Sequence, residues 1–129
     1  MGVDMRVSFQ VAAKPGEWVS VPNEFRGDRS YSLFAWLGAP PKRDSFNCNT
    51  IVPVHKLRGL PKDISPDEEE LYGEHSYSWL TSEEILSAAW PDGAEDNDDP
   101  DNVFIEFINV VKHLHAEHGD VRIVFGFEG

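Results

Sequence analysis

A group of basic and aromatic residues offers the clearest binding chemistry in this sequence. Residues 24–62 hold seven of the eleven Lys and Arg residues but only three acids, in a chain whose net charge is −12. An arginine can grip a phosphate or carboxylate with two parallel N–H groups, and a Tyr or Trp ring can stack on a base. The pattern predicts a site for a small anionic, nucleotide-like ligand, with the contacts Arg29, Tyr31, Arg58, His75 and Trp79. Alternatively, these charges pair with the acidic helices that follow.

The segment after this basic region is strongly acidic. From Asp63 to Val111 there are fifteen Asp or Glu residues and no Lys or Arg. Carboxylates held on one rigid surface can imitate the phosphates of a nucleic acid, so a second hypothesis is an acidic mimic that inhibits another protein. The alternative is a solvated, flexible face. The net charge argues against direct binding to nucleic acid, because phosphate contacts need Lys and Arg.

Patterns for catalysis and for metal binding are weak. His113, His115 and His118 are close in sequence, but at about 100° per helical residue His113 points away from the other two. The acidic stretch 92–101 lacks the Gly and Glu spacing of an EF-hand, and no nucleophile elbow surrounds the serines beside His75. We therefore expect no metal, no cofactor and no catalysis, with a small nucleotide-acting hydrolase or transferase as an alternative.

Alternating apolar residues predict strands at both ends of the chain. Val7, Phe9 and Val11 alternate with polar residues, and a Pro-Gly turn at 14–17 leads to a returning strand at 18–21. Near the C-terminus, apolar side chains again occur at every second position over 121–127. The sequence therefore predicts an N-terminal hairpin and a C-terminal strand.

Helix signals occur between these strands. Residues 31–37 are predicted to form a short helix, capped by Asp28 or Ser30 and ended by Gly38, although its aromatic residues keep a strand open as an alternative. The Ser-Pro-Asp-Glu sequence at 65–68 predicts the start of an acidic helix that Gly73 ends. Such signals are local, because each depends on a few neighbouring residues.

Two further helices are predicted in the second half of the chain. Thr81 to Glu84 form a capping box that begins a helix reaching Trp90. After the acidic stretch, Pro100 and Asp101 begin the longest helix, which Gly119 can end. Its apolar stripe, centred on Phe107, should face the sheet; the stripe consists of Val103, Phe104, Phe107, Ile108, Val111 and Leu114.

Together these elements predict an α+β fold, in which an antiparallel sheet with helices on one face forms a single domain over residues 1–129. A long irregular segment at about 39–63 interrupts it. The lone Cys48 and an N-terminus without an apolar signal-like run favour a cytosolic protein, and no apolar stretch is long enough for a membrane span. The sequence leaves open whether the chain forms a homo-oligomer.

Four motifs resemble a family of small uncharacterised proteins encoded by tailed bacteriophages. They are Arg-Ser-Tyr-Ser-Leu-Phe-Ala-Trp-Leu at 29–37, Arg-Gly-Leu-Pro-Lys-Asp-Ile-Ser at 58–65, His-Ser-Tyr-Ser-Trp-Leu-Thr at 75–81 and Val-Arg-Ile-Val-Phe-Gly-Phe at 121–127. The first motif of the family is usually Arg-Asn-Tyr-Asp-Leu-Phe-Ala, so Ser30 and Ser32 depart from it. The resemblance implies an accessory phage gene product and no named chemistry.

Small phage products without a catalytic motif often act against host defence. We therefore expect a binding protein of the host cytoplasm that sequesters a small anionic ligand or blocks a host defence protein. The acidic mimic, the small hydrolase or transferase, and a structural virion component are the alternatives.

Overall fold

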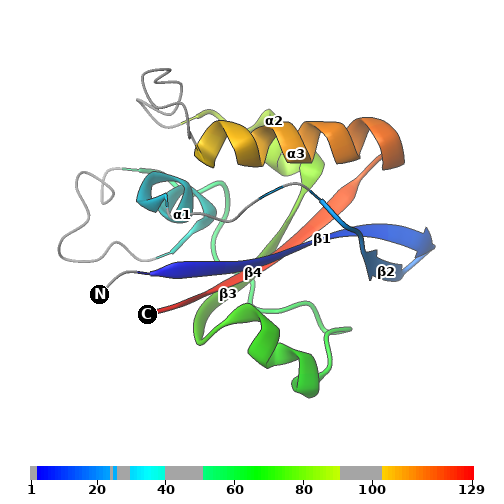
Figure 1. Cartoon of the computed structure of the whole chain (residues 1–129), viewed down its shortest axis with the longest axis horizontal. Helices are drawn as coiled ribbons and strands as arrows, with labels where there is room; N and C mark the ends of the chain where they lie inside the picture. Colours follow the sequence, from blue (N-terminus) through cyan, green and yellow to red (C-terminus); the bar gives the residue numbers. More distant parts are fainter. Residues whose placement is uncertain (1–2, 24, 26–29, 40–50, 91–102) are drawn as a thin grey trace.

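The computed structural model describes residues 3–23, 25, 30–39, 51–90 and 103–129. Its described strands form one antiparallel sheet in the order β2-β1-β4-β3 (Figure 1). These strands are β1 (Asp4–Lys14), β2 (Glu17–Ser20), β3 (His75–Thr81) and β4 (Val121–Glu128). The described helices are α1 (Tyr31–Leu37), the 3-10 helix η2 (Pro66–Tyr72), α2 (Ser82–Ser87) and α3 (Val103–His118). This arrangement confirms the predicted α+β fold with its N-terminal hairpin and C-terminal strand.

Strand β4 is the central element of the sheet. It pairs with β1 on one side and with β3 on the other, and residues 121–127 are all buried. Complete burial is possible because the α-helices cover one face of the sheet and η2 lies against the other (Figure 1). The predicted alternation therefore places the larger apolar side chains of β4 toward the helices, while the intervening residues face η2.

Strand β3 was not among the strands that the sequence predicts. Its pairing with β4 shifts register between His75 and Ser78, so two residues oppose one, and Ser76 has a positive φ of 58°. The bulge breaks the period-two pattern that identifies a strand in a sequence. Only pairing with β4, more than forty positions away in sequence, reveals this strand.

The predicted caps of two helices are confirmed. Ser30 accepts a hydrogen bond from the N–H of Leu33 at 3.3 Å, and Gly38 ends α1 with a φ of 112°, so 31–37 is helical rather than extended. Thr81 and Glu84 form the predicted reciprocal capping box of α2. This helix ends at Ser87 instead of continuing to position 90, because the backbone becomes extended at the next residue.

Of the other two predicted helices, the acidic one forms a 3-10 helix, and the start of the long one lies outside the described residues. The acidic segment forms the 3-10 helix η2 with Gly73 at its end, and the Ser65 hydroxyl donates to the Glu68 carboxylate at 3.1 Å rather than capping the backbone. The expected helix start at Pro100 and Asp101, and the whole acidic stretch 92–101, lie outside the described residues. No helix in the described part of the chain is long and apolar enough to cross a membrane.

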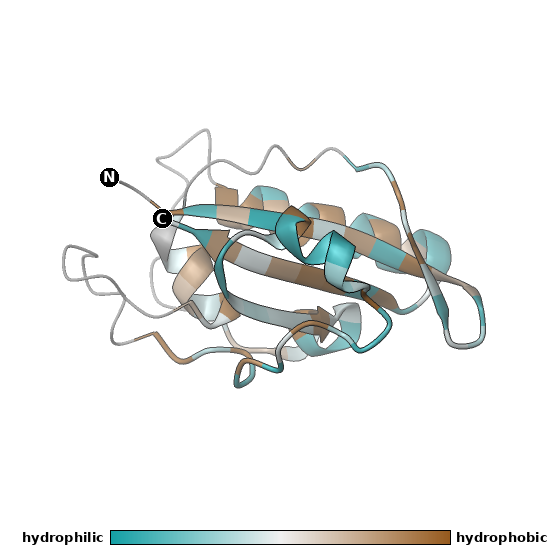
Figure 2. Ribbon diagram, turned by 90° about the horizontal axis from the view of Figure 1, so that it is seen from below, coloured by the Kyte–Doolittle hydropathy of each residue, from teal (hydrophilic) through white to brown (hydrophobic). Residues whose placement is uncertain are grey.

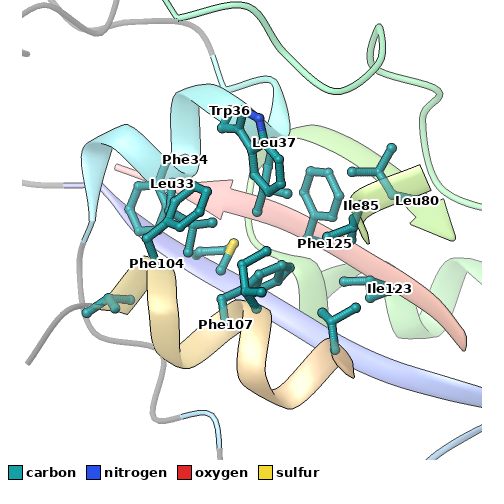
Figure 3. Packing of buried hydrophobic residues seen from close by; sticks show 14 of the residues in the cluster. Leu33, Phe34, Trp36, Leu37, Leu80, Ile85, Phe104, Phe107, Ile123 and Phe125 are labelled. Atoms are coloured by element: carbon teal, nitrogen blue, oxygen red, sulfur yellow. The ribbon is translucent and has the colours of Figure 1, made fainter. Parts of the chain in front are cut away.

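Aromatic rings fill the space between the helices and the sheet (Figure 3). Phe107 of α3 is fully buried, and its ring centroid lies 5.8 Å from that of Phe9 on β1. Trp36 of α1 packs against Phe104 of α3 at 4.9 Å and donates its indole N–H to the carbonyl of Ala89. The apolar stripe of the long helix therefore faces the sheet, as its spacing predicts.

On the opposite face, η2 approaches β4 closely enough to require a glycine. A methyl group at Gly126 would overlap the main-chain oxygen of Tyr72. The Tyr72 hydroxyl in turn lies 2.7 Å from that of Ser8 on β1. Seen from this side, η2 is a hydrophilic segment in front of the sheet (Figure 2), so this face presents polar groups where the helix side presents apolar ones.

Candidate functional site

The segment that carries Arg58 runs beside the outer edge of β3. The N–H of Arg58 donates to the Ser78 hydroxyl at 2.9 Å, and the N–H of Gly59 donates to the carbonyl of Tyr77 at 3.0 Å. An uncovered strand edge exposes main-chain donors and acceptors to other chains. These contacts cover part of the β3 edge and fix the main chain from which the arginine side chain extends.

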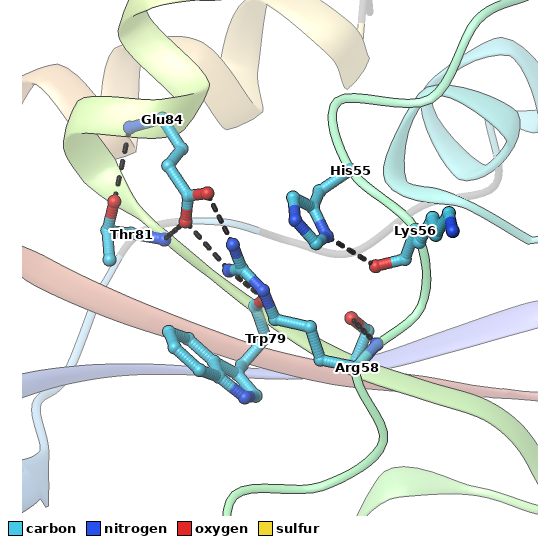
Figure 4. Close-up of polar contacts among 7 residues, drawn as sticks. His55, Lys56, Arg58, Trp79, Thr81 and Glu84 are labelled. Carbon is cyan, nitrogen blue, oxygen red and sulfur yellow. Dashed lines mark hydrogen bonds and ion pairs between the residues drawn. The ribbon is translucent and has the colours of Figure 1, made fainter.

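The Arg58 guanidinium is held from three directions (Figure 4). Its two terminal nitrogens donate to the two carboxylate oxygens of Glu84 at 2.8 and 2.5 Å. One of them also donates to the carbonyl of Trp79 at 3.0 Å, and the guanidinium carbon lies 4.3 Å from the centre of the Trp79 ring. The structure therefore brings together two of the predicted ligand contacts, Arg58 and Trp79, and joins them to a carboxylate.

Glu84 has two structural roles at once. Its Oε1 accepts the N–H of Thr81 at 3.0 Å in the capping box and also accepts from Arg58. The hydrogen bonds from Arg58 lower the pKa of this carboxyl to about 2, against partial burial that would raise it. The same pairing raises the pKa of Arg58. An anionic ligand at this arginine must displace a carboxylate that is already well bound.

The other predicted contacts do not join this cluster among the described residues. His75 pairs with Phe127, whose ring faces the helices, whereas Trp79 pairs with Val124 on the other face of the sheet. The His75 ring nitrogens lie 2.8 Å from the Ser76 hydroxyl and 3.2 Å from the carbonyl of the last residue. Arg29 and the side chain of Tyr31 lie outside what the structure describes.

A second arginine, on the central strand, has a similar environment. Arg122 donates two hydrogen bonds to the carboxylate of Asp63, both at 2.8 Å, and a third to the Gln10 side chain at 2.8 Å. Its guanidinium lies 4.9 Å from the Trp18 ring centre. The pairing lowers the pKa of Asp63. Arg6 also pairs with a carboxylate, that of Glu128. The alternative that the basic middle segment pairs with the helices that follow describes Arg58, whose partner Glu84 belongs to α2, whereas Arg6 and Arg122 lie outside that segment.

Ser82, His115 and Asp120 form a cluster that resembles a catalytic triad in composition only. The Ser82 hydroxyl lies 2.7 Å from His115 Nδ1, donates to Asp120 at 3.0 Å and accepts the N–H of Val121 at 2.9 Å. In a catalytic triad the histidine stands between the other two side chains, whereas here the serine does. Because Ser82 is completely buried, this cluster ties α2 to the turn after α3 and gives no access to a substrate.

The histidines of α3 do not converge on a metal site. His113 is 77% exposed and lies 3.4 Å from Glu117, while His115 is engaged with Ser82 on the other side of the helix. No group of three metal-ligating side chains with suitable geometry occurs among the described residues. The positions of these histidines agree with the helical geometry that separates them.

Helix η2 presents the most concentrated charge on the described surface. Asp67, Glu68, Glu69 and Glu70 follow one another along it and all are exposed. Leu71, next in sequence, is also 65% exposed. The contacts of Tyr72 with β1 and of η2 with β4 hold this segment against the sheet. The acidic surface is therefore carried by a fixed element at this place.

Comparison with models of protein families, with curated proteins and with solved structures finds no match for this chain. The partner of Arg58 is not apparent in the sequence, because Glu84 belongs to a capping box and its second role depends on a loop more than twenty residues away. The buried ion pair of Arg122 is not apparent either, since this arginine occupies a polar position in an alternating strand.

Proposed function

We propose that this chain is a non-catalytic binding protein that uses its acidic surface to occupy a basic, nucleic-acid-binding site on a partner protein. The observation that carries this proposal is the contrast between the described arginines and the acids of η2. The described arginines are each bound to a carboxylate, whereas the four acids at the start of η2 are exposed on a segment fixed to the sheet. Arginine-rich clefts that bind phosphates attract such a surface.

The biological setting follows from the motif resemblance. A phage accessory product in the host cytoplasm that blocks a host defence protein fits a chain without a catalytic arrangement among its described residues. An acidic surface offers a way to compete with nucleic acid for a basic site on such a protein. A small anionic ligand at the basic segment stays a prediction, and at Arg58 it requires the release of Glu84.

The proposal is tested by salt dependence and by competition. The immobilised protein is incubated with host extract at rising ionic strength, with and without duplex DNA, and captured proteins are quantified by mass spectrometry. Partners of an acidic mimic should be nucleic-acid-binding proteins, should dissociate as salt rises, and should be displaced by DNA. The affinity of a purified partner is then measured for each variant.

Two matched variants test whether partner binding depends on the acids of η2 or on negative charge in general. The triple variant Asp67→Asn/Glu69→Gln/Glu70→Gln removes three charges from η2 and leaves Glu68, which accepts from Ser65. Its control, Glu17→Gln/Glu83→Gln/Glu117→Gln, removes three exposed carboxylates elsewhere. We expect the η2 variant to bind the partner at least about tenfold more weakly and the control to change little. Equal losses in both variants, or binding insensitive to salt and DNA, would contradict the proposal.

A further inference from the structure

Main-chain groups of β3 face away from the sheet at every second residue. The carbonyl of Tyr77 accepts the N–H of Gly59 at 3.0 Å, and Gly59 lies outside the strands. In an antiparallel strand the N–H and C=O of one residue point in the same direction, and alternate residues share that direction. The main-chain groups of Trp79 and Thr81 therefore also face outward, whereas those of Leu80 face β4. An outer edge of this kind is the place at which another strand can join a sheet.

Two side chains of opposite charge also cover this edge (Figure 4). The Arg58 guanidinium donates to the outward carbonyl of Trp79 at 3.0 Å. Oε1 of Glu84 accepts the outward N–H of Thr81 at 3.0 Å and also accepts from Arg58 at 2.8 Å. The ion pair therefore binds one main-chain acceptor and one main-chain donor of the edge. We call Arg58, Gly59 and Glu84 the edge cover of β3.

Strand β3 itself lacks the features that usually protect the edge of a sheet. It is seven residues long and contains no Asp, Glu, Lys or Arg. The opposite edge strand, β2, has only four residues and begins with Glu17. Short length and charged side chains discourage the addition of a foreign strand, and β3 has neither. Because β3 is uncharged, two copies of it can pair without placing like charges opposite each other, although the whole chain carries a net charge of −12.

We infer that the edge cover is an autoinhibitory contact that prevents β3 from pairing with β3 of a second copy of this chain. While the ion pair is formed, the guanidinium occupies the place of an incoming donor at the carbonyl of Trp79. When Arg58 and Glu84 separate, two copies related by a two-fold axis can face each other at Trp79 and exchange main-chain hydrogen bonds. The inference goes beyond the proposed function, because it concerns self-association and does not depend on the acids of η2.

Sedimentation experiments on matched variants test whether the ion pair blocks self-association. Arg58→Met removes the guanidinium and keeps a long, unbranched side chain. Arg6→Met makes the same change on β1, which is not adjacent to β3 in the sheet. We expect the dimer dissociation constant of Arg58→Met to be at least about tenfold lower than those of the unsubstituted chain and of Arg6→Met. Equal dissociation constants for the three proteins would overturn the inference.

Amide hydrogen exchange shows whether a dimer forms through β3. The Trp79 amide faces the outer edge and the Leu80 amide faces β4, so pairing between two copies should add protection mainly to the first of them. For Arg58→Met we expect exchange at Trp79 to slow at least about tenfold as the protein concentration rises, while exchange at Leu80 slows much less. A dimer that leaves the Trp79 amide unprotected uses another surface and would contradict pairing through β3.

Glu84→Gln provides the same test if Arg58→Met fails to fold. A glutamine at this position retains an oxygen for the Thr81 N–H but loses the charge that holds Arg58. We expect this variant to dimerise at least about threefold more tightly than the unsubstituted chain, with slowed exchange at Trp79. A folded Glu84→Gln variant that associates like the unsubstituted chain would overturn the inference. An unsubstituted chain whose Trp79 amide becomes protected at high concentration would also overturn it, because β3 would then pair with the ion pair in place.

Discussion

The helix side of the sheet is packed with aromatic rings, whereas the η2 side carries two arginine–carboxylate pairs stacked on tryptophans. Phe107 is completely buried against Phe9, with no polar group involved. On the other face Arg122 and Arg58 each grip a carboxylate and lie over a Trp ring. The face with the aromatic core therefore differs from the face that carries the ion pairs and the acidic helix η2.

The two arginine clusters also differ from each other. The Arg122 side chain is 7% exposed and comes from the central strand, whereas that of Arg58 is 20% exposed and comes from a loop beside an edge strand. A buried charge that loses its partner is costly, since water cannot replace the lost contact. The stabilising effect should therefore decrease from the aromatic core to Arg122 and then to Arg58.

The largest effect is expected for Phe107→Ala. The substitution leaves a cavity in the aromatic core, and we expect a loss of about 3 to 5 kcal/mol in the free energy of unfolding. Chemical denaturation measures this loss. Asn109→Ala, at an exposed position of the same helix, is the control and should change stability little. An unchanged unfolding midpoint for Phe107→Ala would mean that α3 does not pack through this residue.

A smaller loss is expected for Asp63→Asn on the opposite face. The substitution removes the negative charge that faces the buried Arg122 and leaves the Gln10 contact in place. We expect a loss of about 2 kcal/mol, because hydrogen bonds to charged groups are stronger than neutral ones but the carboxylate is half exposed. Asp67→Asn provides the control for a change of charge alone. Equal unfolding free energies for the two variants would show that the Arg122 pair contributes no net stability.

The smallest effect should come from Glu84, and it should depend on pH. The pKa of its carboxyl is about 2 in the folded chain and 4.5 in the unfolded one. Because the folded-state value is lower, the stabilisation is complete above pH 4.5 and is lost as the pH falls toward 2. Since both side chains reach solvent, we expect only about 1 to 2 kcal/mol.

Glu84→Gln isolates this contribution. Its unfolding free energy should be lower than that of the unsubstituted chain near neutral pH and should approach it in acid, where the carboxyl is protonated in both states. Denaturation curves recorded over a series of pH values give the comparison. Arg58→Met tests the other partner of the same pair. A constant difference between the Glu84 variant and the unsubstituted chain at all pH values would contradict the role of this ion pair.

Local sequence signals correctly predicted the hairpin, the last strand, the caps of α1 and α2, and the buried face of α3. Such features depend on a few neighbouring residues, as in the Thr81–Glu84 box, or on the alternation in β4. Charge segregation also offered pairing with the acids that follow as the alternative for the basic middle segment, and the structure shows such a pair for Arg58. Residues close in sequence are sufficient for these predictions because their geometry repeats from one protein to another.

Strand β3 and the two arginine clusters were decided only by the tertiary structure. The bulge at Ser76 hides the alternation of β3, and that strand forms because β4 pairs with it across a long stretch of sequence. Arg58 meets Glu84, and Arg122 meets Asp63, only after the sheet has formed. Such contacts depend on the packing of distant segments, which local propensity and composition do not determine.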